Sequence, residues 1–251
     1  MFPDSLISFF QSHQDVLWII TLSLDLAFTV LMYRFFGRDG LLGCIILSIL
    51  LANLQGPKLT TIFGLQTSLG VIFYSSIFFA TDLLSEKYGR AMANRAVLIG
   101  FSVSCILVLM LSIALLFLPS IDPETAEFSN RIQKSFENIL NFTPRFVFGS
   151  LLAYLISQSL DVWLFHWIRK KTAGRMLWLR NNGSTMISQA VDTLIYSLVV
   201  WWGVVELSTA IQLGLVKYGF KLAIAAIDTP FIYWAISWDH PAQEQPKQSQ
   251  N

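Results

Sequence analysis

The stretch VLIGFSVSCILVLMLSIALLFL, residues 97–118, contains no charged side chain. A helix needs roughly 20 apolar residues to cross the hydrocarbon core of a bilayer, which is about 30 Å thick. The rest of the chain is similar in character, because 54% of its 251 residues are hydrophobic and only 13% are charged. A soluble domain usually carries about 25% charged residues. We therefore predict an all-α integral membrane protein.

Seven segments reach the length of a membrane span or come close to it, so we expect about seven transmembrane helices. The second segment stops early, at NLQGPK (residues 53–58), where glycine and proline disfavour a continuous helix. Residues 59–65 are then expected either to re-enter the membrane or to continue the span after a kink. The seven segments are Val16–Phe36, Leu41–Asn53, Ser68–Leu84, Ala96–Leu118, Arg145–Ile168, Ser184–Val205 and Lys217–Trp238.

Lysine and arginine accumulate on the cytoplasmic side of membrane proteins, and this bias predicts the orientation of the chain. When the connecting loops are assigned alternately to the two sides, one side receives eleven of the 17 basic residues. We therefore expect the N-terminus outside and the C-terminus in the cytoplasm, with a polar, disordered tail at residues 239–251. The long external loop (residues 119–143) is expected to contain an amphipathic helix over Ala126–Leu140. The eleven residues are Arg34, Arg38, Lys87, Arg90, Arg95, Arg169, Lys170, Lys171, Arg175, Arg180 and Lys247.

Two short stretches inside apolar runs nearly repeat each other: SQSLD (residues 157–161) and SQAVD (residues 188–192). The Gln and Asp of each stretch share one helix face, because they are three residues apart. A carboxylate inside a span is costly and needs a partner or a wet cavity. The short basic loop between these spans makes them antiparallel neighbours. We therefore predict that the two faces line one polar site, with both carboxylates at matching depth in the cytoplasmic half.

Further polar side chains lie in the spans or at the break after the second one. Lys217 and Lys221 are one helical turn apart at the outer start of the seventh span. One interpretation is that some carboxylates pair with a basic residue such as Lys221 and only hold helices together. The aromatic run FYSSIFF (residues 73–79) indicates packing rather than a ligand platform. The other polar residues of this group are Asp25, Asn53, Gln55, Asp82 and Asp228.

Several classes of function are disfavoured by the sequence. A net charge of +1 gives no electrostatic footprint for nucleic acid. Cys44 and Cys105 lie in apolar segments and predict neither a disulfide nor a metal site. The sequence has no Gly-rich phosphate loop, no HExxH and no GxSxG, so neither an enzyme nor a cofactor is predicted. A membrane protease dyad is also disfavoured, because neither Asp161 nor Asp192 is followed by glycine.

Five motifs occur in order along the chain: NLQGPK (53–58) with FGL (63–65), ATDLLSEKYGR (80–90), the two Ser-Gln-x-x-Asp stretches, and the segment from Lys221 to DTP (228–230). Together they resemble the queuosine precursor transporter family, also called the vitamin uptake transporter family. The resemblance covers roughly residues 41–238. It implies a six-helix core there, similar to the substrate-binding subunits of energy-coupling-factor vitamin importers. An extra transmembrane helix (residues 1–40) precedes that core, so Asp25 inherits no family role.

The family implies an inner-membrane importer of a 7-deazaguanine, either a queuosine precursor such as preQ0 or preQ1 or queuine itself, for the salvage of tRNA modification. A carboxylate can accept the ring N–H and the exocyclic amine of such a base together, and an amide can serve its carbonyl. We expect one of the two carboxylates, Asp161 or Asp192, to bind the guanine edge and the other to neutralise any aminomethyl cation. Lys221 would neutralise an Asp in the empty site, and Asp82 is favoured over Glu86 as a ligand. The predicted binding residues are Asn53, Gln55, Asp82, Gln158, Asp161, Gln189, Asp192 and Lys221.

Three alternatives stay open at the level of sequence. They are a transporter of another heterocyclic vitamin or nucleobase, a structural membrane protein without cargo, and an intramembrane hydrolase. The chain has no nucleotide-binding motif, so it does not hydrolyse ATP itself. A facilitator, a proton-coupled carrier and a protein driven by an energising partner module all remain compatible with the sequence, as does a homodimer.

Overall fold

The computed structural model describes residues 3–56, 58–140, 144–201 and 206–238. This part of the chain contains seven α-helices, a π-helical turn η1 (Ser197–Trp201) and one β-hairpin. Four of the helices are long and apolar enough to cross a membrane: α2, α3, and most of α5 and α7. The seven helices are α1 (Asp4–Ser12), α2 (Gln14–Gln55), α3 (Val71–Ala114), α4 (Ala126–Leu140), α5 (Pro144–Lys171), α6 (Leu177–Tyr196) and α7 (Leu207–Ile236).

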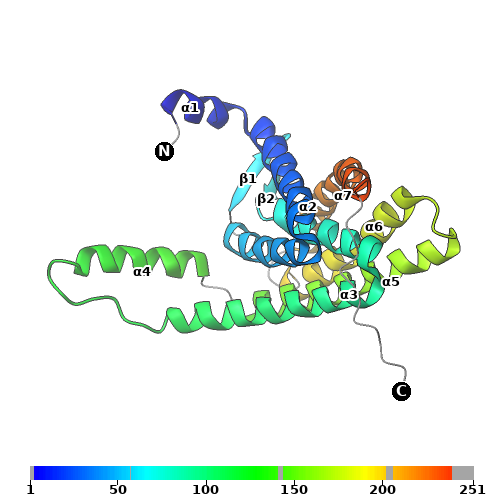
Figure 1. The fold of residues 1–251 in the computed structure, drawn as a ribbon. Helices are drawn as coiled ribbons and strands as arrows, with labels where there is room; N and C mark the ends of the chain where they lie inside the picture. Colours follow the sequence, from blue (N-terminus) through cyan, green and yellow to red (C-terminus); the bar gives the residue numbers. More distant parts are fainter. Residues whose placement is uncertain (1–2, 57, 141–143, 202–205, 239–251) are drawn as a thin grey trace, which may run out of the picture.

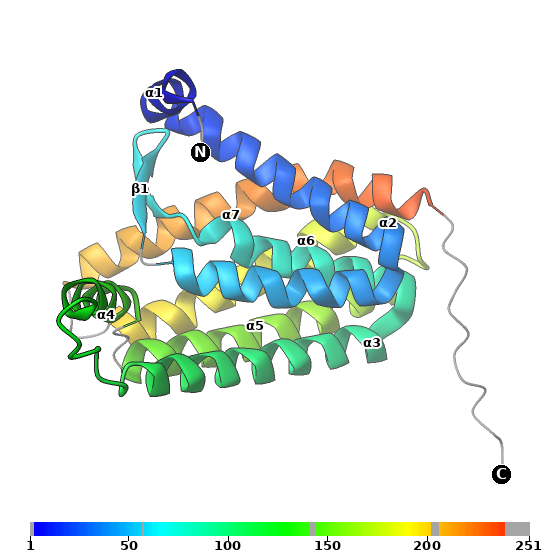
Figure 2. The ribbon, with the colours of Figure 1, turned by 60° about the vertical axis from the view of Figure 1, so that its left-hand side comes forward.

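Helices α2 and α3 are each interrupted by one glycine. They contain 42 and 44 residues, and at about 1.5 Å per residue either would be roughly twice the thickness of a bilayer core if it were straight. Gly37 (φ 58°, ψ −131°) and Gly89 (φ 81°, ψ 175°) leave the helical region, and each helix folds back on itself there (Figure 2). The first four predicted segments are therefore the halves of two broken helices.

The segment after α2 is a β-hairpin of β1 (Leu59–Ile62) and β2 (Leu65–Ser68), paired antiparallel with Ile62 opposite Leu65. The two turn residues, Phe63 and Gly64, both have positive φ (51° and 73°), as a type I′ hairpin turn requires. The expectation that this segment continues the second span is therefore wrong. Its β-branched residues and its turn glycine favour a hairpin over a helix.

The apolar core lies between α2, α3 and α7, where Leu22, Leu26, Ile72, Ile224 and Ile232 are completely buried. Helix α4 lies outside this core and projects from the bundle in Figure 1. Its bounds agree with the predicted amphipathic helix, and the apolar side chains of Phe128, Ile132 and Phe136 are exposed. In Figure 2, α4 and the hairpin lie at the same end of the bundle.

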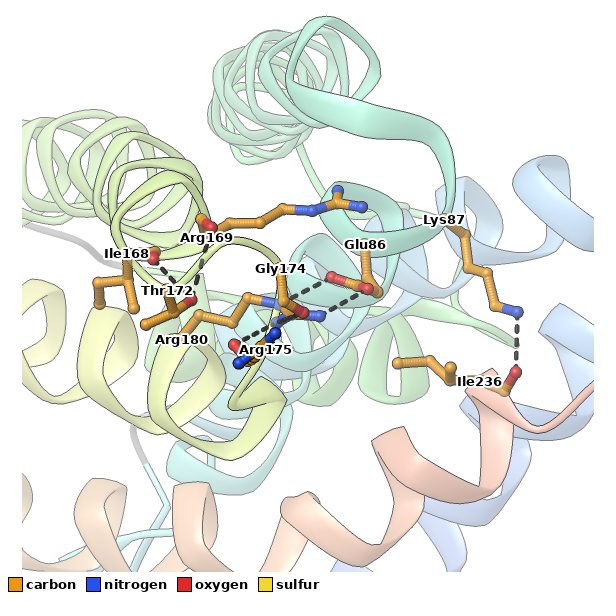
Figure 3. Close-up of polar contacts among 9 residues, drawn as sticks. All are labelled: Glu86, Lys87, Ile168, Arg169, Thr172, Gly174, Arg175, Arg180 and Ile236. Carbon is orange, nitrogen blue, oxygen red and sulfur yellow. Dashed lines mark hydrogen bonds and ion pairs between the residues drawn. The ribbon is translucent and has the colours of Figure 1, made fainter.

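The opposite end of the bundle is held by the consecutive residues Glu86 and Lys87. Arg180 donates to both carboxylate oxygens of Glu86, at 2.7 and 2.9 Å, and also to the backbone carbonyl of Gly174 at 3.0 Å (Figure 3). Lys87 Nζ donates at 2.9 Å to the carbonyl of Ile236 and so satisfies a group that the end of α7 leaves free. Glu86 and Lys87 thus join α3 to the α5–α6 connection and to α7.

We predict that Gly89→Ala destabilises the protein by about 1–3 kcal/mol, because its backbone conformation is one that only glycine adopts easily. Gly219→Ala in α7 is a matched control, since a Cβ at either position would meet nothing within 4 Å. Thermal unfolding of the purified proteins in detergent measures the effect. A melting temperature for Gly89→Ala equal to that of Gly219→Ala would contradict the prediction.

Candidate functional site

Helices α5 and α6 are joined by crossed hydrogen bonds between their two Ser-Gln-x-x-Asp stretches. Ser157 Oγ donates to Asp192 Oδ1 at 3.3 Å, and Ser188 Oγ donates to Asp161 Oδ1 at 2.8 Å. All four residues are buried. The serine of each stretch therefore binds the carboxylate of the other, and the pair of bonds fixes the antiparallel register of the two helices.

This register corrects the expected depth of the carboxylates. Asp161 is level with Ser188, whereas Asp192 is level with Ser157, which is four residues away from Asp161 on α5. At about 1.5 Å per residue, the two carboxylates are roughly 6 Å apart along the helix axes. The expectation of matching depth is wrong because α6 begins at Leu177, well before the predicted start of the sixth span at Ser184.

Asp192 has partners on three other helices. Tyr74 Oη donates to its Oδ1 at 2.6 Å from α3, Ser157 donates to the same oxygen from α5, and Lys221 Nζ forms an ion pair with its Oδ2 from α7. The Lys221 ammonium also lies 4.6 Å from the centre of the Tyr74 ring. Lys221 and Asp192 are only 1% and 2% exposed. Lys221 thus neutralises a carboxylate, an arrangement that both the binding role and the helix-pairing interpretation of the sequence predict.

A cavity of about 520 Å³ lies beside Asp192, a size typical of small-molecule sites. All the major elements of the bundle contribute to its wall. Gln66 comes from the hairpin, Tyr74 from α3, Tyr154 from α5 and Lys217 from α7. Polar groups from distant parts of the sequence therefore converge on one space large enough for a bicyclic heterocycle.

Two of the eight predicted binding residues, Asn53 and Asp192, belong to the wall of this cavity. Asn53 Nδ2 also donates to the carbonyl of Ile49 in its own helix at 2.8 Å. Lys221 is completely buried, and its ammonium is bound to Asp192. Gln55 is half-buried at the end of α2. The other four are buried among the helices and are not part of the cavity wall: Asp82, Gln158, Asp161 and Gln189.

A second polar cluster contains three carboxylates. Asp82 accepts a hydrogen bond from Thr185 at 3.2 Å, Asp228 accepts one from Asn181 at 2.9 Å, and Asp82 also neighbours Asp161. Among the described residues, no lysine or arginine forms an ion pair with these three carboxylates, and no group of His, Cys, Asp and Glu is arranged to hold a metal ion. In the described part of the chain, the side chains that donate to these carboxylates are the neutral groups of Thr185, Asn181 and Ser188.

Gln158 and Gln189 are 0% and 1% exposed, yet neither their amide nitrogens nor their amide oxygens have a hydrogen-bond partner in the described part of the chain. Leaving a buried polar group without a partner costs about 1–3 kcal/mol. Native proteins rarely tolerate this without a reason such as a functional role. The two glutamines thus offer donors and acceptors that a bound molecule could satisfy.

The sequence analysis missed several residues of the cavity wall. The packing interpretation of residues 73–79 holds for Phe73, Phe78 and Phe79, which are buried, but it is incomplete for Tyr74. A signal was present in the sequence, because Tyr74 is the only aromatic residue of that run with a hydroxyl group. That hydroxyl can donate a hydrogen bond to a carboxylate. Lys217 carried a signal too, since it is one helical turn from Lys221.

Comparison with known proteins places the chain in a family. Residues 68–235 match the family described as "Putative vitamin uptake transporter". The chain belongs to this family of transporters. It is therefore a multi-pass membrane protein and a transporter rather than an enzyme.

Two relatives are similar over most of their length. The first, from Bacillus subtilis (strain 168), is named "Probable queuosine precursor transporter" and is 39% identical over 219 residues, which is 87% of this chain and 93% of the relative. The second, from Escherichia coli (strain K12), is named "Queuosine precursor transporter" and is 26% identical over 170 residues, which is 66% of this chain and 71% of the relative. No solved structure matches the chain.

The buried ion pair predicts a test by paired substitution. Lys221→Met should destabilise the protein by up to about 3–5 kcal/mol, because it leaves the Asp192 carboxylate buried without a counter-charge. The double variant Lys221→Met/Asp192→Asn should recover much of that loss, since both charges are gone. Thermal unfolding in detergent measures both effects.

Arg38→Met is the control, because Arg38 belongs to an exposed pair with Asp39 and should contribute no more than about 1 kcal/mol. The prediction fails if the double variant is as unstable as the sum of its single substitutions.

Proposed function

We propose that this protein imports a 7-deazaguanine, a precursor of queuosine or queuine itself, across the cell inner membrane for use in tRNA modification. The observation that supports this most strongly is the cavity of about 520 Å³ beside Asp192. A carboxylate at the edge of a small-molecule cavity suits the two adjacent donors of a guanine edge. The names of the Bacillus subtilis and Escherichia coli relatives point to the same cargo.

The proposed architecture has seven spans, with the N-terminus outside and the C-terminus in the cytoplasm. The breaks at Gly37 and Gly89 divide α2 and α3 into pieces of span length, and α5, α6 and α7 supply the rest. We assign residues 41–238 to a six-helix core similar to the substrate-binding subunits of energy-coupling-factor importers, preceded by the helix at residues 1–40 and followed by a cytoplasmic tail. In this orientation the hairpin and α4 lie outside. The cavity, whose wall includes Gln66 of the hairpin and Asn138 of α4, then receives cargo from the outside.

In the proposed binding mode, Asp192 accepts the ring N–H and the exocyclic amine of the base. The amide of Asn53 serves its carbonyl, and the ring of Tyr74 or Tyr154 supplies a stacking surface, which is worth about 1–3 kcal/mol per base. Gln55 closes the outer side, and Lys221 keeps Asp192 neutralised while the site is empty.

The other four predicted residues, Asp82, Gln158, Asp161 and Gln189, form a proposed second binding position for the cargo. Asp161 lies about one helical turn from Asp192, toward the end of the bundle that holds Glu86 and Arg180. Gln158 and Gln189 have unsatisfied amides beside it in sequence, and Asp82 neighbours it in space. These four residues lie outside the cavity wall in this conformation, so they would contact the base only after a conformational change on the way inward.

Uptake of a labelled precursor, in cells that can neither make nor import 7-deazaguanines, tests this function. The intact chain should restore uptake and queuosine in tRNA. Asp192→Asn should reduce uptake about tenfold or more, because a hydrogen bond to a charged group contributes about 1.5–3 kcal/mol and 1.4 kcal/mol corresponds to a factor of ten. Asp161→Asn should also reduce it.

Asp39→Asn is the matched control, because Asp39 is exposed and forms an ion pair with its neighbour Arg38 on the surface. Its uptake should equal that of the intact chain. Near-normal uptake by an Asp192→Asn protein of normal membrane abundance would contradict the binding mode. Failure of the intact chain to restore queuosine would contradict the function.

A further inference from the structure

One face of α6 carries a row of buried polar side chains that begins at the cavity. It runs toward the end of the bundle where Arg180 binds Glu86 (Figure 3). Successive members are four, three and four residues apart, so they share one face of the helix. At most 4% of any member is exposed, and Asp192 is the member in the cavity wall. The members of this α6 row are Asn181, Thr185, Ser188 and Asp192.

Each of the three neutral members of the α6 row donates a hydrogen bond to a buried carboxylate from a different helix. At about 1.5 Å per residue, successive members are about 4.5–6 Å apart along the helix axis. The row therefore connects the cavity to carboxylates of α5, α3 and α7 at successive levels. The three bonds are Ser188 to Asp161 of α5 (2.8 Å), Thr185 to Asp82 of α3 (3.2 Å) and Asn181 to Asp228 of α7 (2.9 Å).

Three oxygens along the α6 row lack a hydrogen-bond donor in the described part of the chain: Asp82 Oδ1, Asp161 Oδ2 and Asn181 Oδ1. Asn181 is 0% exposed, and its amide is directed into the cluster because its Nδ2 donates to Asp228. An amide oxygen and an ionised carboxylate only accept hydrogen bonds, whereas a protonated carboxyl group also donates one. What these oxygens lack is therefore a donor, and a proton bound to a carboxylate supplies it.

The charges around the α6 row also call for a bound proton. Asp161 neighbours both Asp82 and Asp228, so these three carboxylates repel one another when all are ionised. In the part of the chain that the structure describes, none of the three forms an ion pair and no group of side chains is arranged to hold a metal ion. The ion pairs at the two ends of the row are Lys221–Asp192 and Arg180–Glu86.

We propose that the α6 row and its carboxylates carry a proton from the cavity to the inner end of the bundle, and that this proton enters the cell together with the cargo. The inference rests on the proposed function and names what drives it. A proton from outside binds Asp161, passes to Asp82 and then to Asp228, and leaves on the cytoplasmic side. Asp192 belongs to both the cavity wall and the row, which links cargo binding to the proton path. Chains of acidic residues inside membrane spans relay protons in pumps and transporters.

Buried carboxylates also have a simpler role, because as neutral acids they can hold helices together without ever releasing their protons. That role accounts for each hydrogen bond separately. It accounts neither for the continuity of the row with the cavity at Asp192 nor for the acceptor oxygens that have no donor. Both features are expected of a path that protons enter and leave.

Transport into proteoliposomes that contain the full-length protein tests the inference. Labelled preQ0 is the probe, because its nitrile carries no charge and any charge that moves with it belongs to a coupled ion. The membrane potential is held at zero, and the outside is made more acidic than the inside. With a difference of about one pH unit, the intact chain should concentrate the probe up to about tenfold, since one coupled proton converts a tenfold proton gradient into a tenfold cargo gradient. A protonophore should abolish this accumulation.

Asp228→Asn tests the path, because Asp228 is a carboxylate of the cluster that the proposed binding mode does not use, and asparagine keeps its size but binds no proton. The variant should lose the accumulation driven by the pH gradient, whereas its exchange of labelled for unlabelled preQ0 without a gradient should equal that of the intact chain. Asp25→Asn is the matched control. Asp25 is a carboxylate inside α2 that accepts a hydrogen bond from Ser76 and is no partner of the α6 row, so this variant should keep the accumulation.

Exchange by the intact chain without accumulation under the pH gradient would overturn the inference and leave the proposed function standing. Accumulation driven by a sodium gradient in place of the pH gradient would overturn it too, and neither result depends on a variant that folds. Normal accumulation by the Asp228→Asn protein would contradict the path. If the intact chain shows neither exchange nor accumulation, the proposed function fails together with the inference.

Discussion

The structure depends on the placement of one carboxylate, that of Asp192, at the meeting point of four helices. Within a bilayer a buried charge is tolerated only with partners, and this carboxylate takes Tyr74 from α3, Ser157 from α5 and Lys221 from α7. Apolar packing alone specifies helix rotation weakly, since lipid is as apolar as the helix surfaces. The bonds to Asp192 fix these rotations, and they also leave one side of the carboxylate facing the cavity.

The two Ser-Gln-x-x-Asp stretches form equivalent hydrogen bonds, but their two carboxylates have different partners. The crossed bonds of Ser157 and Ser188 are alike, yet Asp192 has a lysine partner, whereas the partners of Asp161 among the described residues are neutral donors and the nearby Asp82. The difference comes from the surroundings of the two helices rather than from the motifs themselves. A carboxylate paired with a cation is stabilised as an anion and can accept further hydrogen bonds. A carboxylate beside another carboxylate is destabilised by repulsion when both are ionised, and a bound donor or a shared proton reduces that repulsion.

Much of the fold follows from hydropathy, because a bilayer imposes a length on every span. The segments on either side of Gly37 and Gly89, and the helix at Ala126–Leu140, were predictable for that reason. The hairpin was not, since its strands are only four residues long and the preceding break was compatible with several continuations. The sequence identified polar residues within the spans, but it did not show which way their side chains point in the folded bundle. Spacing defines the face that a residue shares, whereas packing against neighbours sets where that face points, so the inclusion of Tyr74 and Lys217 in the cavity wall could not be derived.

The hydrogen bonds around Asp192 also explain how the proposed base could bind without separating the helices. Lys221 holds Oδ2, and the weakest of the remaining contacts is the 3.3 Å bond from Ser157 to Oδ1. A neutral N–H donor could take over that oxygen and leave the ion pair intact, so the helices would stay in register. The ion pair thus holds the helices together through Oδ2, and Oδ1 is the oxygen of Asp192 through which the proposed base would bind.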